Sequence, residues 1–197
     1  MFNFTYNKQI DEECWQRIIK AGVLFGHFFP QEYHITDRGT VKARERAVLY
    51  REVWDEMGDD FMAGIKKIYK IEFPNDVKCF VNTSPYSMDG YPSGHISISM
   101  NFTNREKIKG VIVHESAHYI FRKYYYDFCK KIGCSHDDFE EIKEVITVIN
   151  QDVFSDIWEP GWDVHKKYRE KTLALWRSGL DIEGIVQLIK EMINEKK

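Results

Sequence analysis

Long apolar runs are missing from this sequence of 197 residues. None approaches the roughly 20 consecutive apolar residues that a helix needs to span a bilayer, so we expect no membrane partner. The first eight residues also lack the basic start and the apolar stretch of a signal peptide. Together these absences predict a cytoplasmic protein.

The sequence also lacks an excess of positive charge and closely spaced cysteine pairs, which argues against two further classes of protein. The 28 Lys and Arg residues nearly balance the 31 Asp and Glu residues, which leaves a formal net charge of -3. Domains that bind nucleic acid usually carry a positive excess, so nucleic acid is not an expected partner. The four cysteines include no Cys-x-x-Cys pair, which fits a reduced compartment better than a disulfide scaffold.

The chain has no internal repeat and no low-complexity linker, which predicts one domain over residues 1–197. Hydrophobic spacing and turn residues predict an α+β fold that is mostly helical, with a small sheet. The expected parts are a helical N-terminal part at 1–72, a strand hairpin with two helices at 73–160, and C-terminal helices at 161–197. Helices are expected over 9–28, 40–69 with an interruption near Gly58, 103–131, 137–157, 163–177 and 181–195, and strands over 78–83 and 95–100.

The helix expected over residues 103–131 carries the motif His114-Glu115-Ser116-Ala117-His118. A capping box at Thr103 and Glu106 predicts its start, and its apolar circumference predicts a buried central helix. His114 and His118 are four residues apart, so both rings project from one face and can share one tetrahedral Zn²⁺ at about 2.0–2.1 Å each. Glu115, about 100° around the helix, flanks the ion and can accept a proton from zinc-activated water.

Two core histidines that bind no metal are the alternative interpretation of this motif. A histidine and a glutamate are costly to bury without a partner, whereas a metal ion satisfies both imidazoles. The burial expected of this helix therefore favours the metal site.

The motif, the alternating strand before it and the buried helix resemble the zincin metallopeptidases over about residues 95–160. No His-x-x-Gly-x-x-His continuation follows His118, so the resemblance is to the gluzincins rather than the metzincins. It implies a zinc cofactor, a peptide or protein substrate, and a Glu on the next helix as third ligand. It also implies that strand 95–100 is the sheet edge that borders the metal cleft and pairs with the substrate.

Glu140, Glu141 and Glu144 compete for the place of the third ligand. The motif helix continues about 13 residues beyond His118, so an antiparallel return helix reaches the level of the metal late, which favours Glu144. If the return helix matched the length of the motif helix beyond His118 strictly, the third ligand would lie further along the chain, at Asp152. Residues 143–150 and 161–165 are also similar to a pattern in small bacterial His-Glu-x-x-His proteins of unsettled function, and distantly to repressor-cleaving peptidases of the ImmA/IrrE type.

His165 follows a Pro-Gly turn and is a candidate for stabilising the oxyanion of the tetrahedral intermediate, as a His or Tyr does in related zincins. A histidine at a helix start with no catalytic role is the alternative. The expected function is a zinc-dependent metallopeptidase in which His114, His118 and Glu144 bind the metal and Glu115 is general base and acid. The alternative is a zincin-like binding or regulatory module with a structural zinc. The sequence indicates no oligomeric state.

Overall fold

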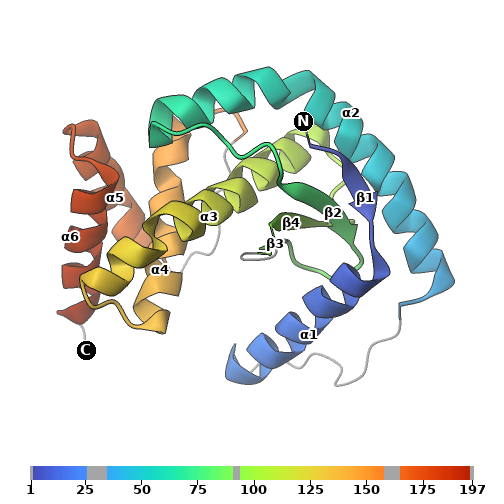
Figure 1. Ribbon diagram of the computed structural model, residues 1–197, viewed down its shortest axis with the longest axis horizontal. Helices are drawn as coiled ribbons and strands as arrows, with labels where there is room; N and C mark the ends of the chain where they lie inside the picture. Colours follow the sequence, from blue (N-terminus) through green and yellow to red (C-terminus); the bar gives the residue numbers. More distant parts are fainter. Residues whose placement is uncertain (1, 26–34, 91–93, 158–164, 196–197) are drawn as a thin grey trace.

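The computed structural model describes residues 2–25, 35–90, 94–157 and 165–195. The chain folds into the α+β, mostly helical architecture that the sequence predicts, with one four-stranded sheet (Figure 1). In chain order the elements are β1 (Phe4–Tyr6), α1 (Lys8–Phe25), α2 (Asp37–Tyr69), β2 (Lys78–Asn82), β3 (Met88–Asp89), β4 (His95–Ser99), α3 (Arg105–Lys131), α4 (His136–Ile146), the 3-10 helix η1 (Thr147–Asp152), α5 (Lys166–Arg177) and α6 (Ile182–Asn194).

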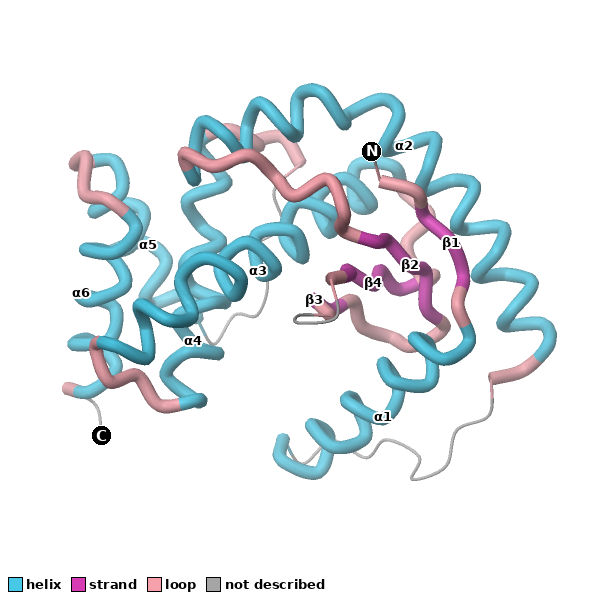
Figure 2. The backbone as a smooth tube through the Cα atoms, in the orientation of Figure 1, coloured by secondary structure: helices cyan, strands magenta, loops and turns pink. Residues whose placement is uncertain are grey.

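The strands are arranged in the order β1-β2-β4-β3 (Figure 2). β2 lies parallel to both β1 and β4, with Phe4 opposite Cys79 and Lys78 opposite His95. The predicted hairpin of residues 78–83 and 95–100 is therefore wrong. The chain makes a return passage through β3 before β4 begins, and this passage lets β4 run in the same direction as β2.

The prediction that residues 95–100 form the sheet edge is also wrong. β4 is an internal strand, because β3 pairs with it antiparallel and places Met88 opposite Ser97. The edge strand on this side of the sheet is β3. It has only two residues, which is too short for an alternating pattern to be visible in the sequence.

The helices fall into two groups, one around the sheet and one beside it (Figure 1). α2 packs against β1 and β2, α3 packs against β3 and β4, and α1 contacts β2. The aromatic core between α2 and the sheet includes Phe2, whose ring stacks on Trp54 with 4.1 Å between ring centroids. α4, α5 and α6 pack on one another beside the C-terminal half of α3.

Local sequence explains most helix limits, with some differences from the predictions. α2 is continuous through Gly58, and the expected interruption is absent, since one glycine inside a helix costs only about 1 kcal/mol. The side chain of Asn104 caps α3 in place of Thr103. Ser135 forms a capping box with Asp138 at the start of α4, which ends at Ile146 and passes into η1 rather than continuing as one helix to residue 157.

The predicted limits at residues 26–28 and 163–164 lie outside the described residues. Across the part of the chain that is described, no helix combines the length and the apolar character needed to cross a bilayer. The predicted burial of the central helix is confirmed, because residues 112–121 of α3 are all buried. The His-Glu-x-x-His motif therefore lies in the core of the molecule rather than on its surface.

Candidate metal centre

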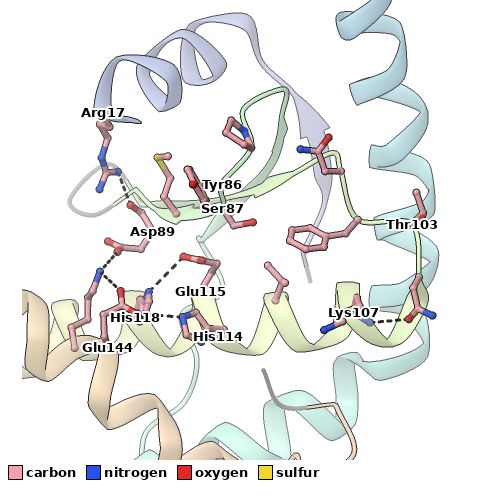
Figure 3. A pocket seen from close by; sticks show the side chains of 17 residues that line it. Arg17, Tyr86, Ser87, Asp89, Thr103, Lys107, His114, Glu115, His118 and Glu144 are labelled. Carbon is pink, nitrogen blue, oxygen red and sulfur yellow. Dashed lines mark hydrogen bonds and ion pairs between the residues drawn. The ribbon is translucent and has the colours of Figure 1, made fainter. Parts of the chain in front are cut away.

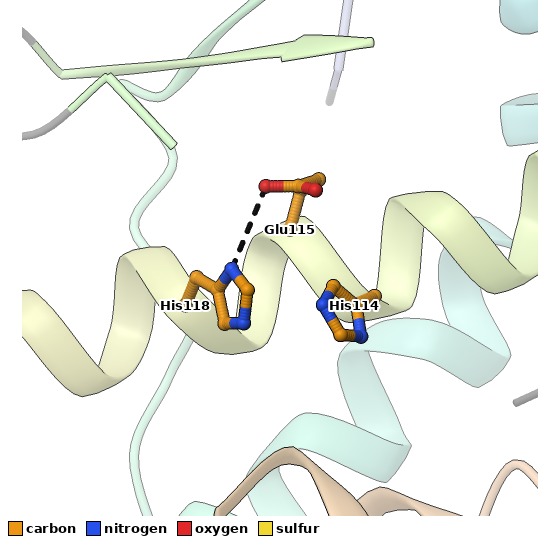
Figure 4. Close-up of side chains that lie close together, drawn as sticks. All are labelled: His114, Glu115 and His118. Atoms are coloured by element: carbon orange, nitrogen blue, oxygen red, sulfur yellow. Dashed lines mark ion pairs between the residues drawn. The ribbon is translucent and has the colours of Figure 1, made fainter. Parts of the chain in front are cut away.

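His114 and His118 project from one face of α3, as their spacing predicts (Figure 4). Their ring centroids are 4.3 Å apart, and as whole residues His114, Glu115 and His118 are at most 9% exposed. Glu115 leaves the helix on the neighbouring face and points toward the strands. One turn of a buried helix thus presents two imidazoles and a carboxylate to the same small space.

Glu144 reaches this space from α4. Its Oε2 atom lies 3.6 Å from Nε2 of His114 and 3.5 Å from Nε2 of His118. Ligand atoms on a tetrahedral zinc ion with bonds of 2.0–2.2 Å lie about 3.3–3.6 Å apart. The distances from this oxygen to the two nitrogens are therefore in the range expected for a carboxylate oxygen and imidazole nitrogens that share one ion.

The competing acids of the sequence prediction are engaged elsewhere. Glu140 forms a bidentate pair with Arg122, at 2.9 and 3.1 Å. Glu141 lies 3.8 Å from Nδ1 of His165, and Asp152 is bound by Arg177 at 2.6 Å. Glu140 and Glu141 have different partners because successive residues of α4 point in different directions around its axis, and Asp152 lies beyond α4, in η1.

Glu115 offers a second way to complete a three-residue group. One carboxylate oxygen of Glu115 and one nitrogen from each histidine all lie within 4.8 Å of one another. The Oε2 atom of Glu115, however, is 3.6 Å from Nδ1 of His118, on the other edge of the ring from Nε2. We favour Glu144, because a single oxygen of Glu144 lies near Nε2 of both histidines.

Several polar atoms of the motif have no hydrogen-bond partner among the described residues. They are Nδ1 of His114, Oε2 of Glu115 and Nε2 of His118, and all three are buried. A buried polar atom without a partner costs about 1–3 kcal/mol, so such atoms call for a ligand. A metal ion bound near Glu144 Oε2 would give Nε2 of His118 a partner, and imidazole nitrogen and carboxylate oxygen are ordinary zinc ligands. It would leave Nδ1 of His114, across the ring from Nε2, without a partner among the described residues.

The electrostatics of the chain without an ion agree with this arrangement. Burial alone would lower the pKa of His118, but the adjacent Glu144 carboxylate outweighs burial and raises that pKa to about 9. Burial would raise the pKa of Glu144, but the positive charge of His118 and the nearby imidazole of His114 hold that pKa well below its usual range. In the absence of a metal, the two residues are thus an ion pair that carries one proton.

A buried network of charges surrounds Glu144, and the sequence prediction did not include it. Lys143 is 7% exposed, and its Nζ atom lies 3.2 Å from Glu140, 3.4 Å from Glu144 and 3.5 Å from Asp89. Asp89 on β3 also binds Nε of Arg122 at 2.8 Å. Two sequence positions could have pointed to this network. Arg122 follows His118 by one helical turn, and Lys143 directly precedes Glu144.

The motif opens onto a cleft of about 590 Å³ (Figure 3). α3 forms one wall of this cleft, and the opposite wall consists of residues 85–89, which include β3, together with residues 101–104. His114, Glu115, His118 and Glu144 all line the cleft. The sheet edge borders the site as expected, but the bordering strand is β3.

His165 does not line this cleft. It stands at the start of α5, half-buried, with Nδ1 facing Glu141. Burial lowers the pKa of His165 and outweighs the opposite effects of Glu144 and Glu141. The structure therefore brings together the three predicted metal ligands and the predicted general base, and it leaves the predicted oxyanion residue outside the cleft.

Comparison of the chain with protein-family models, with curated proteins and with solved structures gave no match in any of the three.

Proposed function

We propose that this chain is a zinc-dependent metallopeptidase in which His114, His118 and Glu144 hold the ion. The observation that carries the proposal is the position of Glu144 Oε2, within 3.6 Å of Nε2 of both histidines, beside a Glu115 carboxylate whose Oε2 atom has no hydrogen-bond partner among the described residues. A zinc ion bound there would polarise the scissile carbonyl and lower the pKa of a water molecule to about 7.

Glu115 is the general base and then the general acid in this proposal. Its carboxylate lines the cleft, and its Oε2 atom is free of hydrogen bonds among the described residues. It accepts a proton from the attacking water and delivers that proton to the nitrogen of the leaving amine. We leave His165 out of the catalytic steps, because its side chain does not reach the cleft.

The proposed substrate is a peptide or an exposed segment of another protein. β3 is the edge strand of the sheet and lines the cleft, which supports a substrate lying alongside β3 rather than β4. Met88, Phe102 and Val111 add apolar surface for substrate side chains. The four cysteines are free, which supports a reducing compartment such as the cytoplasm as the place of action.

The test compares wild-type protein with Glu115→Gln after removal of metal and reconstitution with one equivalent of zinc. We expect the wild type to cleave an unfolded protein or a peptide mixture, and Glu115→Gln to lose at least about 100-fold in rate while retaining the ion. Mass spectrometry of the products and metal analysis of both proteins give the two readouts. Glu106→Gln is the matched control, because Glu106 lies on the same helix, is exposed and pairs with Lys109.

Three outcomes separate the candidate functions. Cleavage by the wild type and not by Glu115→Gln supports the peptidase. A stoichiometric ion with no cleavage of any substrate would favour the binding or regulatory module with a structural zinc. Wild-type protein that takes up no ion would contradict both.

A further inference from the structure

The two oxygens of the Glu144 carboxylate have different partners. Oε2 faces Nε2 of His114 and Nε2 of His118, at 3.6 and 3.5 Å. Oε1 lies 3.4 Å from Nζ of Lys143. One oxygen is thus directed to the proposed ion and the other to an ammonium group.

Lys143 is held in place by its own surroundings. Besides Glu144, its ammonium lies 3.2 Å from Glu140 and 3.5 Å from Asp89. Asp89 is 2% exposed and is fixed in turn by Arg122, at 2.8 Å to one oxygen and 3.4 Å to the other. The ammonium therefore has carboxylates from β3 and from α4 around it, and it has little freedom to leave Glu144.

This network joins the three elements that form the site. Asp89 comes from β3, Arg122 from α3, and Glu140 and Lys143 from α4. Three carboxylates and two cations share the space, so the lysine both balances charge and fills the position beside Oε1. A neutral residue at 143 would leave that oxygen free to turn toward the histidines.

Building on the proposed function, we propose that Lys143 is a positioning residue that makes Glu144 a one-oxygen metal ligand, and that Asp89 on β3 anchors it. With Oε1 bound to the ammonium, Glu144 contributes a single ligand atom, and one coordination position stays available to water and substrate. Without the ammonium, both oxygens can bind, and the coordination number rises. Partners of metal ligands act in this way by fixing ligand orientation.

The experiment replaces zinc by Co²⁺, whose visible absorption is strong in four-coordinate sites and weak in sites of higher coordination number. Wild type and Lys143→Met are each loaded with one equivalent of Co²⁺. We expect an intense visible band in the wild type and a loss of about half of its intensity or more in Lys143→Met. An ion pair of purely structural importance would change stability and leave this spectrum as it is.

Two further variants keep the test decisive. Asp89→Asn combined with Lys143→Met removes one charge of each sign, so it avoids leaving a buried carboxylate uncompensated if the single variant does not fold. We expect the same loss of intensity in the double variant. Lys109→Met is the control, because Lys109 lies on α3, pairs with Glu106 at 2.9 Å and does not line the cleft.

The outcomes distinguish this inference from the proposed function. A folded Lys143→Met or double variant with one bound ion and the wild-type spectrum overturns the inference and leaves the peptidase proposal in place. Wild-type protein that binds neither Co²⁺ nor zinc removes the proposed function, and the inference falls with it. A wild-type spectrum in Lys109→Met together with a weakened one in Lys143→Met supports the positioning role.

Discussion

Asp89 is a single side chain on which stability and site geometry both depend. Burial would raise the pKa of its carboxyl group, but Lys143 and Arg122 outweigh burial and lower that pKa to about 2. A carboxyl group whose pKa is lowered by folding stabilises the folded state above its unfolded pKa. That contribution is lost as the pH falls from about 4 to about 2.

We therefore expect Asp89→Asn to be less stable than wild type by about 2 kcal/mol at pH 7. The difference should shrink as the pH falls toward 2, because wild-type Asp89 then becomes protonated as well. Urea unfolding of both proteins at pH 7 and at pH 2.5 measures the two differences. Equal differences at both pH values would show that the charge of Asp89 contributes nothing to folding.

His118 predicts a second pH dependence, this time of metal binding. In the chain without an ion, burial lowers the pKa of His118, but Glu144 raises it to about 9, so the ring carries a proton at neutral pH. Zinc must displace this proton, since an imidazole binds metal through a neutral nitrogen. We expect the apparent zinc affinity to rise by about tenfold per pH unit between pH 6 and 8. Competition with a chelator of known proton affinity measures this slope, and a flat response would contradict the ion pair of His118 and Glu144.

At the scale of elements, β3 is positioned by a close contact at Gly90. A Cβ atom at residue 90 would lie 2.0 Å from Nε2 of His95, and the Gly90 amide donates to the His95 carbonyl at 2.8 Å. In Gly90→Ala either the buried His95 ring or the end of β3 must therefore shift, and we expect β3 to move away from β4 and to displace Asp89.

We expect Gly90→Ala to lower the free energy of unfolding by about 1–3 kcal/mol, the usual cost of overpacking. We also expect it to weaken the Co²⁺ absorption band, because a displaced Asp89 no longer holds Lys143 beside Glu144. Thermal unfolding and the visible spectrum of the Co²⁺ protein give the two measurements. An alanine variant with wild-type stability would mean that His95 gives way without cost.

The elements also show which parts of the site could be predicted from sequence. His114, Glu115 and His118 could be placed relative to one another because helix geometry is local, and Glu144 could be preferred because α3 and α4 are neighbours joined by a short turn. Asp89 could not be predicted. It lies on a two-residue strand within a segment rich in Pro, Gly and Ser, and its role depends on contacts with α3 and α4.

The same contrast holds for the sheet. The helical content and the buried central helix follow from hydrophobic spacing, and both predictions are confirmed. The predicted antiparallel direction of β2 and β4 was wrong, because two strands that are close in sequence suggest a hairpin. β1 was missed, because its three residues show too little alternation. Sheet pairing depends on distant partners, which residue spacing alone does not reveal.

At the scale of the whole molecule, the four cysteine thiols differ in how far they are buried. Cys14, Cys79 and Cys129 are at most 1% exposed, whereas Cys134 is partly exposed. Burial raises the pKa of Cys14 to about 11 and that of Cys129 to about 12, so neither forms the reactive thiolate near neutral pH.

Burial raises the pKa of Cys134 as well, but its thiol is the only one of the four that is partly exposed. We therefore expect a chromogenic disulfide reagent at pH 8 to react rapidly with one thiol in the folded protein, Cys134, and with four after denaturation. Cys134→Ser should abolish the rapid phase, which identifies the residue. Rapid reaction of three or four thiols in the folded wild type would mean that the core opens far more often than its packing indicates.

The position of β1 has a consequence for synthesis on the ribosome. Phe4 pairs with Cys79, so β1 must wait for its strand partner until α1, α2 and β2 have all emerged. At the usual rate of 5–20 residues per second, that interval is roughly 4–15 s. During it, β1 has no strand partner in its own chain, and a factor that shields nascent apolar segments would raise the yield of folded protein.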